Sequence, residues 1–288
     1  MKKIFLIIML LLFANPCFAI KIGLLTDTDN VHFGTSVFGT IIDANTNRTV
    51  VEIDAMQGYE IKPYNNVMAI KMKGKYYKIN SDNIVIKPVS FGYVCTKSKW
   101  YRGILRIQNK GGKLTVINDV DLEDYIKGVV PAEMPSGWEL EAHKAQAVAA
   151  RSYAVANLGK RASLGFDLKD TPDDQAYGGA SAETGQTNKA VEETQGIVLT
   201  HDMKVITAYY SASAGGQSLT ASDVWGSNLP YLRSVPSFDD NVGKKGHGVG
   251  MSQHGANNLA KQGYNGYQIL QYFYKDVTFA KLNPEYYK

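Results

Sequence analysis

The segment VVPAEMPSGW (residues 129–138) constrains this chain most, because it sets a single carboxylate between two prolines. Proline fixes its own φ and biases the preceding residue away from the helical region. The pattern therefore predicts a short helix over 122–130 that ends at Pro131, with Glu133 in extended or turned backbone beyond it. A carboxyl group in a stiff setting beside apolar Met134 can stay protonated near neutral pH and act as a general acid. The competing interpretation is a solvated surface charge.

The N-terminus carries the pattern of an export signal. Two lysines after Met1 precede an apolar run over 4–14, and small Ala19 follows, which predicts a signal peptide over residues 1–19. The run is shorter than the roughly 20 residues that span a bilayer. We therefore expect an exported protein of the periplasm or cell envelope.

Strand and helix patterns predict an α+β fold of mixed helices and antiparallel strands, preceded by a small β-rich N-terminal module. Residues 20–95 consist of short β-branched runs separated by Asn, Asp and Gly, and we predict that they only pack or space the rest. Residues 96–288 then form the domain that carries Glu133 and the other candidate residues. Its first strands make a hairpin around 109–112, because two glycines end that turn.

Composition excludes several classes of function. The formal net charge is +4, which gives no support to a nucleic-acid partner. Without the signal peptide the chain keeps one cysteine, Cys95, so it forms neither an internal disulfide nor a thiolate metal cluster. We expect Cys95 to be a buried structural thiol in a strand.

A helix is predicted directly after the Glu133 segment. Ser136 and Glu139 match a capping box, so the helix should run from Gly137 to about Asn157. Lys144 and Arg151 are seven residues apart and share one face of it. Two interpretations stay open: the cations snorkel at the edge of an apolar stripe, or both point into a polar cleft.

Later segments predict further short elements. A helix capped by Thr187 should end near Gly196, and two strands should form a hairpin around 201–203. One helix should stop at Gly263 and another should be capped by Asn265. A closing strand is expected over 277–279.

The stretch YYSASAGG (209–216) predicts a polar binding wall, because tyrosine faces can stack on sugar rings and glycines let a backbone approach a ligand. It lacks the Gly-x-Ser-x-Gly elbow of a serine nucleophile. His247 and His254 do not have the i, i+4 spacing of a helical zinc site. The aspartates at 170–174 do not match a calcium-binding EF-hand loop. No metal and no cofactor are expected.

Five segments in a fixed order resemble the stage II sporulation protein D family (SpoIID/LytB-like) over about residues 100–280. They are LEDYIKGVVPAEMP (122–135), KAQAVAARSYA (144–154), DQAY (174–177), YSASAGG (210–216) and HGVGMSQ (247–253).

The resemblance implies a lytic transglycosylase acting on peptidoglycan glycan strands, with Glu133 as the catalytic glutamate. Some members carry zinc ligands where this chain has Lys169, Asp173 and Asp174, so no zinc is expected here. We take the following as candidates for binding the sugar and positioning the acid: Lys144, Arg151, Gln175, Tyr177, Tyr209, Tyr210, Ser211 and His247.

The expected reaction cleaves the linkage between N-acetylmuramic acid and N-acetylglucosamine and gives a 1,6-anhydro product, with Glu133 as acid and then base. Its partners would be glycan strands, with a cell-wall amidase as a further candidate. One rival is a non-catalytic wall-binding protein that stimulates an amidase. Another is a two-carboxylate hydrolase with Asp174 or Asp223 as the second group.

Overall fold

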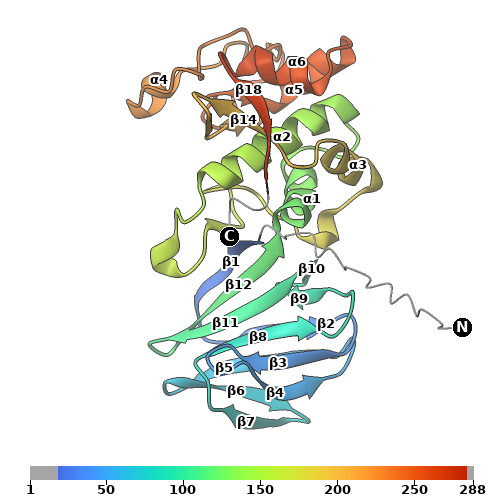
Figure 1. The fold of residues 1–288 in the computed structure, drawn as a ribbon, viewed down its shortest axis with the longest axis vertical. Coiled ribbons are helices and arrows are strands. Elements are labelled where there is room, and N and C mark those ends of the chain that lie inside the picture. Colours follow the sequence, from blue (N-terminus) through green and yellow to red (C-terminus); the bar gives the residue numbers. More distant parts are fainter. Residues whose placement is uncertain (1–18, 284–288) are drawn as a thin grey trace, which may run out of the picture.

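The computed structural model describes residues 19–283, with strands at one end of the molecule and helices at the other (Figure 1). The predicted signal peptide lies outside the described residues except for Ala19, where the first strand begins. The strands that precede the first helix are β1 (Ala19–Thr28), β2 (Val31–Thr35), β3 (Gly39–Asp43), β4 (Arg48–Ile53), β5 (Tyr59–Tyr64), β6 (Val67–Met72), β7 (Lys75–Ile79), β8 (Asn83–Pro88), β9 (Val94–Thr96), β10 (Lys99–Tyr101), β11 (Ile104–Lys110) and β12 (Lys113–Asp121).

These strands form two sheets and confirm the β-rich N-terminal module. One sheet has the order β13-β1-β12-β11-β8-β3-β4, where β13 (Leu168–Lys169) pairs in parallel with β1. The other has the order β10-β9-β2-β5-β6-β7. Because β8 pairs with β11 and β1 pairs with β12, the larger sheet includes strands from both sides of residue 95. The proposed domain limits stay a prediction.

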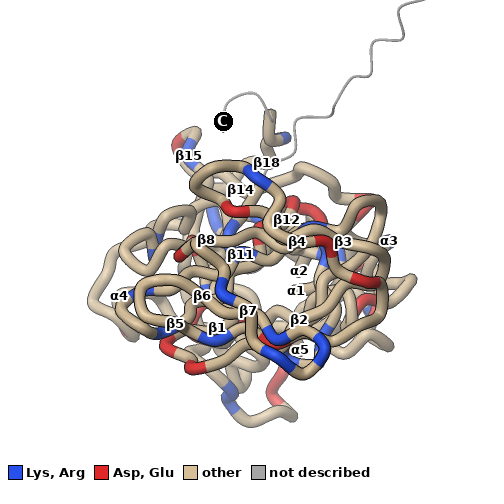
Figure 2. The backbone as a smooth tube through the Cα atoms, turned by 90° about the horizontal axis from the view of Figure 1, so that it is seen from below, with Lys and Arg blue, Asp and Glu red and all other residues tan. Residues whose placement is uncertain are grey.

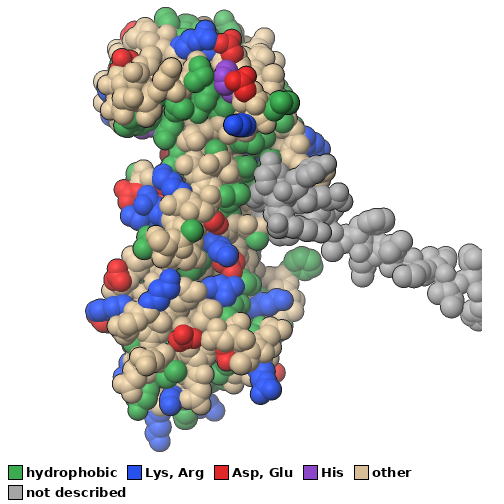
Figure 3. All heavy atoms as spheres, turned by 60° about the vertical axis from the view of Figure 1, so that its left-hand side comes forward, with side chains coloured by type: hydrophobic (Ala, Val, Ile, Leu, Met, Phe, Trp, Pro, Cys, Tyr) green, Lys and Arg blue, Asp and Glu red, His purple; other side chains and the backbone are tan. Residues whose placement is uncertain are grey.

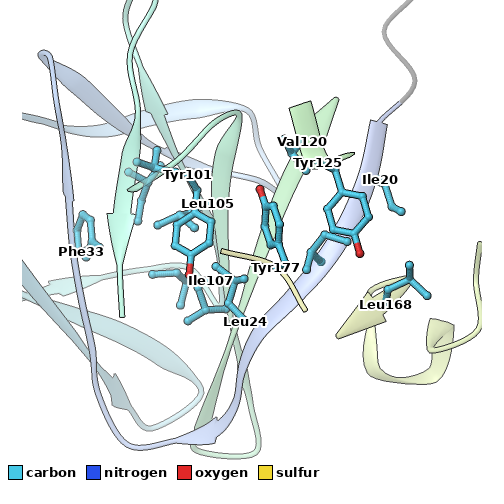
Figure 4. Close-up of a cluster of buried hydrophobic side chains, with 14 of the residues drawn as sticks. Ile20, Leu24, Phe33, Tyr101, Leu105, Ile107, Val120, Tyr125, Leu168 and Tyr177 are labelled. Carbon is cyan, nitrogen blue, oxygen red and sulfur yellow. The ribbon is translucent and has the colours of Figure 1, made fainter. Parts of the chain in front are cut away.

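The sheets share their core with the first two helices. Strand β11 alternates between buried and part-buried residues, and its hairpin turn needs Gly111 and Gly112, which have φ values of 62° and 85°. Three buried tyrosines join this sheet to the helical part, and Figure 4 shows them among the aliphatic side chains. Tyr177 lies 4.9 Å from Tyr125 and 5.6 Å from Tyr101, measured between ring centroids.

The second half of the chain confirms the α+β class. Its helices are α1 (Leu122–Glu133), α2 (Leu140–Ala156), α3 (Gly185–Glu193), α4 (Ala221–Trp225), α5 (Gln253–Lys261) and α6 (Gly266–Phe273), with short 3₁₀ turns at Ala162–Leu164 and Ala180–Ala182. Its strands after β13 are β14 (Ile197–His201), β15 (Lys204–Val205), β16 (Tyr210–Ser211), β17 (Met251–Ser252) and β18 (Thr278–Lys281).

The prediction that helix α1 ends at Pro131 is wrong. The helix does not end at Pro131 but continues through it, and Glu133 is its last residue. Its last turn closes with a bond from the Met134 N–H to the Val130 carbonyl at 3.0 Å. Burial of Val130 and Met134 outweighs the local cost of an internal proline, about 3 kcal/mol. Only the side after Glu133 is extended, because Met134 precedes Pro135.

The predicted start of helix α2 is also wrong. Glu139 rather than Ser136 is the N-cap residue, and it makes no side-chain cap bond. A turn forms first, in which the Trp138 N–H donates to the Pro135 carbonyl, and the Glu139 N–H donates to Asn257 from another helix. The helix ends at Ala156 with Asn157 as its C-cap, close to the predicted end.

Other local predictions have mixed outcomes. The cap of α3 is Thr184, three residues before the predicted Thr187, which instead completes the capping box from inside the helix. The cap of α6 is confirmed, since Asn265 accepts from the Gln268 N–H at 2.9 Å. The β14–β15 hairpin is confirmed, and β18 closes that sheet. Cys95 is half-buried in β9 rather than fully buried, and this burial raises its pKa.

Charged residues of both signs are distributed over the described part of the chain. Basic and acidic residues are scattered among the other residues along the backbone, as Figure 2 shows. In the space-filling view both signs also occur side by side over the surface (Figure 3). Within residues 19–283, no helix is both long and apolar enough to span a bilayer.

Candidate functional site

A cavity of about 540 Å³ lies where segments far apart in the chain meet. The end of α1, the second half of α2 and the loop after it form one part of the lining. The strand end at 209–212, helix α4 and the loop at 245–247 form the other part. The lining residues are Glu133, Tyr153, Lys160, Pro172, Asp173, Asp174, Tyr209, Tyr210, Ser211, Ala212, Trp225, Lys245, Gly246 and His247.

Glu133 contributes its carboxyl group to this cavity from the last position of α1. Burial raises its pKa, and hydrogen bonds from Ala176, Gln253 and Tyr210 oppose that rise without cancelling it. The Ala176 N–H donates to Oε1 at 2.7 Å, while the Gln253 amide approaches Oε2 at 3.4 Å. Oε1 therefore accepts the shorter of these two bonds.

A buried chain of side chains stands behind Glu133. The Tyr125 hydroxyl donates to Gln175 Oε1 at 3.2 Å, and Gln175 Nε2 donates to the Tyr210 hydroxyl oxygen at 2.8 Å. Because Tyr210 accepts from Gln175, its own proton is free to point at Glu133. Burial, together with the nearby Glu133, raises the pKa of Tyr210 far above its ordinary value, so it stays a donor.

Three rings form an aromatic wall of the cavity, defined here as Tyr209, Trp225 and His247. The ring centroids of Tyr209 and Trp225 lie 4.6 Å apart, and that of His247 lies 5.1 Å from Trp225. Trp225 remains 42% exposed, so part of its surface is open to a ligand. Rings in such a cluster give a large apolar surface with polar edges, which suits the faces of sugar rings.

His247 is a neutral member of this wall. Burial lowers its pKa, and the nearby Lys244 lowers it further. Its Nδ1 accepts a hydrogen bond from the Val249 N–H at 3.0 Å, which assigns the proton to Nε2. The flanking glycines fit a tight loop: Gly250 has φ 75°, and a Cβ there would lie 2.0 Å from the Tyr209 carbonyl oxygen.

Asp174 is a second carboxylate in the cavity lining, but its oxygens are already occupied. Oδ1 accepts from Lys160 at 2.6 Å, and Oδ2 accepts from Arg161 Nε at 2.8 Å and from the Lys169 N–H at 2.8 Å. Burial alone would raise its pKa, yet these donors hold the pKa of Asp174 below its usual value. Asp174 is therefore a fixed anion that anchors the loop and makes a poor base or nucleophile.

The other candidate second carboxylate, Asp223, has a capping role. Its Oδ2 accepts from both the backbone N–H and the hydroxyl of Thr220, which completes the capping box of α4. It does not line the cavity.

A fully buried carboxylate, Asp239, supports the binding wall from behind. It accepts from the N–H groups of Ala214 and Gly216 and from three serine hydroxyls, those of Ser213, Ser237 and Ser252. Burial alone would raise its pKa, but these donors lower the pKa to about 2. The YYSASAGG segment is thus shaped around a permanent negative charge.

The structure brings five of the nine candidate residues together at the cavity. Glu133, Tyr209, Tyr210, Ser211 and His247 line it, and Gln175 lies directly behind. The Ser211 hydroxyl is buried and has no hydrogen-bond partner within the described residues, so it is available to a ligand.

Three other candidates lie elsewhere. Arg151 is fully buried in a two-bond ion pair with Glu123, and Lys144 pairs with Glu141 and Glu193 on the α3 side. Tyr177 is buried with its hydroxyl donating to Asn118 at 2.9 Å. Neither cation points into the cavity, so the polar-cleft interpretation of their spacing is wrong; the packing of α2 against α1 and α3 explains their placement.

Sequence reasoning missed several lining residues. Trp225 and Lys245 stand in segments without a recognisable pattern, and Tyr153 was placed in a helix but not in a site. Tyr153 is one turn beyond Ala150 on α2, whose carbonyl accepts from Gln175 at 3.3 Å, so its helical spacing could have indicated this face. The described residues contain no group of three His, Cys, Asp or Glu side chains able to hold a metal ion.

A carboxyl group with a raised pKa, beside an aromatic wall and fixed anions, is able to act as a general acid. Residues 110–201 match the Stage II sporulation protein (SpoIID) family. This part of the chain is therefore a domain of the SpoIID family.

Three relatives illustrate the relationship. An uncharacterised protein of Brachyspira hyodysenteriae is 33% identical over 196 residues, covering 68% of this chain and 49% of its own length. The amidase enhancer of Bacillus subtilis is 48% identical over 107 residues, covering 37% of this chain and 14% of its own. The stage II sporulation protein D of Bacillus subtilis is 27% identical, covering 57% of this chain and 76% of its own. The chain thus spans about half or less of the first two relatives.

Proposed function

We propose that this protein is an exported lytic transglycosylase of the cell envelope that cleaves peptidoglycan glycan strands with Glu133 as its single acid and base. The observation that carries the proposal is the state of the three carboxyl groups that line one cavity. Burial raises the pKa of Glu133, whereas donors from basic residues lower the pKa values of Asp173 and Asp174. Membership of a sporulation-related cell-wall family supports the choice of substrate.

In the proposed reaction, protonated Glu133 donates its proton to the glycosidic oxygen that leaves N-acetylmuramic acid. Positive charge develops on the muramyl ring as the bond breaks. The C6 hydroxyl of the same residue then attacks C1, and the Glu133 carboxylate takes the hydroxyl proton. The products are a 1,6-anhydromuramyl end and a free hydroxyl on the leaving sugar, so Glu133 returns to its acid form and no water is consumed.

The surroundings of Glu133 fit both halves of this cycle. Burial favours the neutral acid before the reaction. The Ala176 N–H at 2.7 Å and the Tyr210 hydroxyl stabilise the carboxylate that forms after proton donation. Donors that stabilise the carboxylate formed in the reaction lower the barrier to proton donation. Burial still keeps the pKa of the resting acid raised.

A two-carboxylate hydrolase would need a second free carboxyl group, either as nucleophile or as base for a water. Asp174 accepts hydrogen bonds on both oxygens from Lys160, Arg161 and Lys169, and Asp223 caps α4. Asp174 has no free lone pair without first breaking these bonds, and Asp223 does not line the cavity. Asp173 does line it, but Asp173 is ion-paired with Lys169 and its pKa is lowered. The single-acid route is therefore the better supported one.

The test is product analysis of purified glycan strands digested by the intact protein and by Glu133→Gln. The proposal expects anhydromuramyl ends from the intact protein and at least about a hundredfold slower cleavage by the variant. Reducing ends would support hydrolysis instead, and full activity of Glu133→Gln would refute the role of Glu133. Glu52→Gln, at an exposed position of β4 outside the cavity, is the matched control.

A second candidate is a wall-binding protein that stimulates a separate amidase. One specific observation favours it: a relative 48% identical over 107 residues is named an amidase enhancer. That function would leave glycan strands intact and would tolerate Glu133→Gln. Amidase assays with and without this protein, using both forms, separate the two candidates.

A further inference from the structure

We propose a second contact surface for glycan strands, outside the cavity and centred on Phe238. A shallow depression of about 470 Å³ is lined by Phe238, Asp240, Asn241, Asn258, Lys261 and Gln262. It lies beside α5, in the helical end of the molecule (Figure 1). The identity of the polymer rests on the function proposed above, whereas the surface itself rests on the observations that follow.

The backbone at Phe238 is strained. Its φ of 56° lies in the left-handed region, which bulky residues rarely adopt and which Gly or Asn adopts at little cost. Its neighbours Ser237 and Asp239 are both fully buried, so the loop turns sharply and leaves the side chain between them partly exposed. A small residue would satisfy that turn better than phenylalanine does.

The ring also gives up burial, since Phe238 is 36% exposed. An aromatic residue that is strained and also exposed contributes little to folding, and such conflicts concentrate at ligand-contacting positions. We infer that the ring is retained for contact with another molecule.

The ring is held in place before any ligand arrives. Its centroid lies 5.3 Å from that of Tyr272 in an edge-on contact, and the Tyr272 hydroxyl donates to the Pro236 carbonyl at 2.7 Å. The Asn258 side chain donates to the Phe238 carbonyl at 2.8 Å and fixes the backbone. A preorganised ring loses little entropy when it binds a ligand.

The chemistry around the ring suits a hydroxyl-rich and amide-bearing ligand. Asn241, Asn258 and Gln262 offer amide donors and acceptors, and the charges of Asp240 and Lys261 are of opposite sign. An apolar ligand would leave the amides unpaired. N-acetylated sugars satisfy the ring and the amides together. An open depression also admits a continuous chain more readily than a closed pocket would.

Two contacts on one polymer raise the effective concentration of the strand at the cavity. We therefore expect the Phe238 surface to affect long strands and to leave short fragments, which reach only one site, unaffected.

The test uses Phe238→Asn, because asparagine tolerates the left-handed conformation and the variant should unfold at an equal or higher denaturant concentration. Met203→Asn is the matched control: Met203 also has a positive φ, 60°, and is 97% exposed, in the turn between β14 and β15. In a Glu133→Gln background, in which cleavage should be at least about a hundredfold slower, binding to purified glycan strands is measured by co-sedimentation. Phe238→Asn should bind about tenfold more weakly, and Met203→Asn should bind as the parent does.

The cleavage readout uses the same two substitutions in the chain that retains Glu133. Phe238→Asn should raise KM on long strands, with kcat and the cleavage of a soluble tetrasaccharide unchanged. Unaltered strand binding by Phe238→Asn, or no strand binding by the parent, overturns the second surface. If binding depends on Phe238 but no form cleaves glycan, the proposed reaction fails and the surface stands.

Discussion

Replacing Arg151 tests whether this residue serves the fold or the substrate. Its guanidinium group is fully buried and donates to Glu123 at 2.8 and 2.7 Å and to the Ile197 carbonyl at 3.0 Å. These bonds join α1, α2 and the start of β14. Arg151→Met keeps most of the side-chain volume but leaves the Glu123 carboxylate without its partner.

The expected cost follows from those contacts. Breaking a buried ion pair by removing one partner costs roughly 3–5 kcal/mol. Glu123 keeps a bond from the Gly196 N–H at 3.0 Å and its side chain is 17% exposed, so water can relieve part of the penalty. We therefore expect the lower end, about 3 kcal/mol of unfolding free energy, out of a total of about 5–15 kcal/mol.

The double variant Arg151→Met with Glu123→Gln removes the uncompensated charge. It should be less destabilised than the single Arg151 variant, by about 2 kcal/mol, which is a measurable coupling energy. Urea unfolding at pH 7, followed by circular dichroism, gives both numbers. A single-variant cost below about 1 kcal/mol, accompanied by a raised KM for glycan, would refute the structural role and return Arg151 to the binding site.

Three more outcomes are expected. Because the pKa of Glu133 is raised in the folded state, the intact protein loses stability as pH rises from the unfolded pKa to the folded one; Glu133→Gln should be more stable above that window and equal below it, measured as unfolding free energy against pH. Trp225→Ala should raise KM about tenfold with little change in unfolding midpoint. Trp138→Ala, outside the cavity, should instead lower the unfolding midpoint and leave KM unchanged. Similar KM values for the two variants would refute the aromatic wall. The pKa of Asp239 is about 2, so its contribution is full above the unfolded pKa of 3.8 and is lost as pH falls toward 2; Asp239→Asn should lower unfolding free energy by about 3 kcal/mol at pH 7 and remove that acid dependence.

The sequence predicted local features whose cause is also local. The Asn265 cap depends on one side chain and a backbone N–H three residues away, and both lie inside the predicted segment. Glu133 was placed at the site because its block, read with four others, resembles one family. The binding role of residues 209–211 was predicted from the tyrosines and serine of that segment, and these residues line the cavity.

Features decided by packing could not be read in the same way. Helical spacing shows that Lys144 and Arg151 share a side of α2, but not that α1 and α3 cover that side. Proline bias predicted an end at Pro131, yet burial of Val130 and Met134 carries the helix two residues further. The carboxylate of Asp239 gains its importance from donors far apart in sequence, and no local pattern marks that convergence.

Because α1 continues past Pro131, Glu133 lies at the C-terminus of a helix, and this position affects its pKa. A carboxyl group at a helix C-terminus faces the negative end of the helix dipole, which disfavours its ionised form in addition to burial. Asp174 lies at the same cavity with the opposite surroundings, two cationic side chains and one N–H, and its pKa moves the opposite way. The third carboxylate of the lining, Asp173, accepts from Lys169 Nζ at 2.7 Å, and this bond lowers its pKa as well. Among the carboxyl groups that line the cavity, Glu133 alone has a raised pKa, so it is the proton carrier and the two aspartates are anions. The proposed reaction needs no more than this, because Glu133 gives the proton and takes it back when an internal hydroxyl attacks.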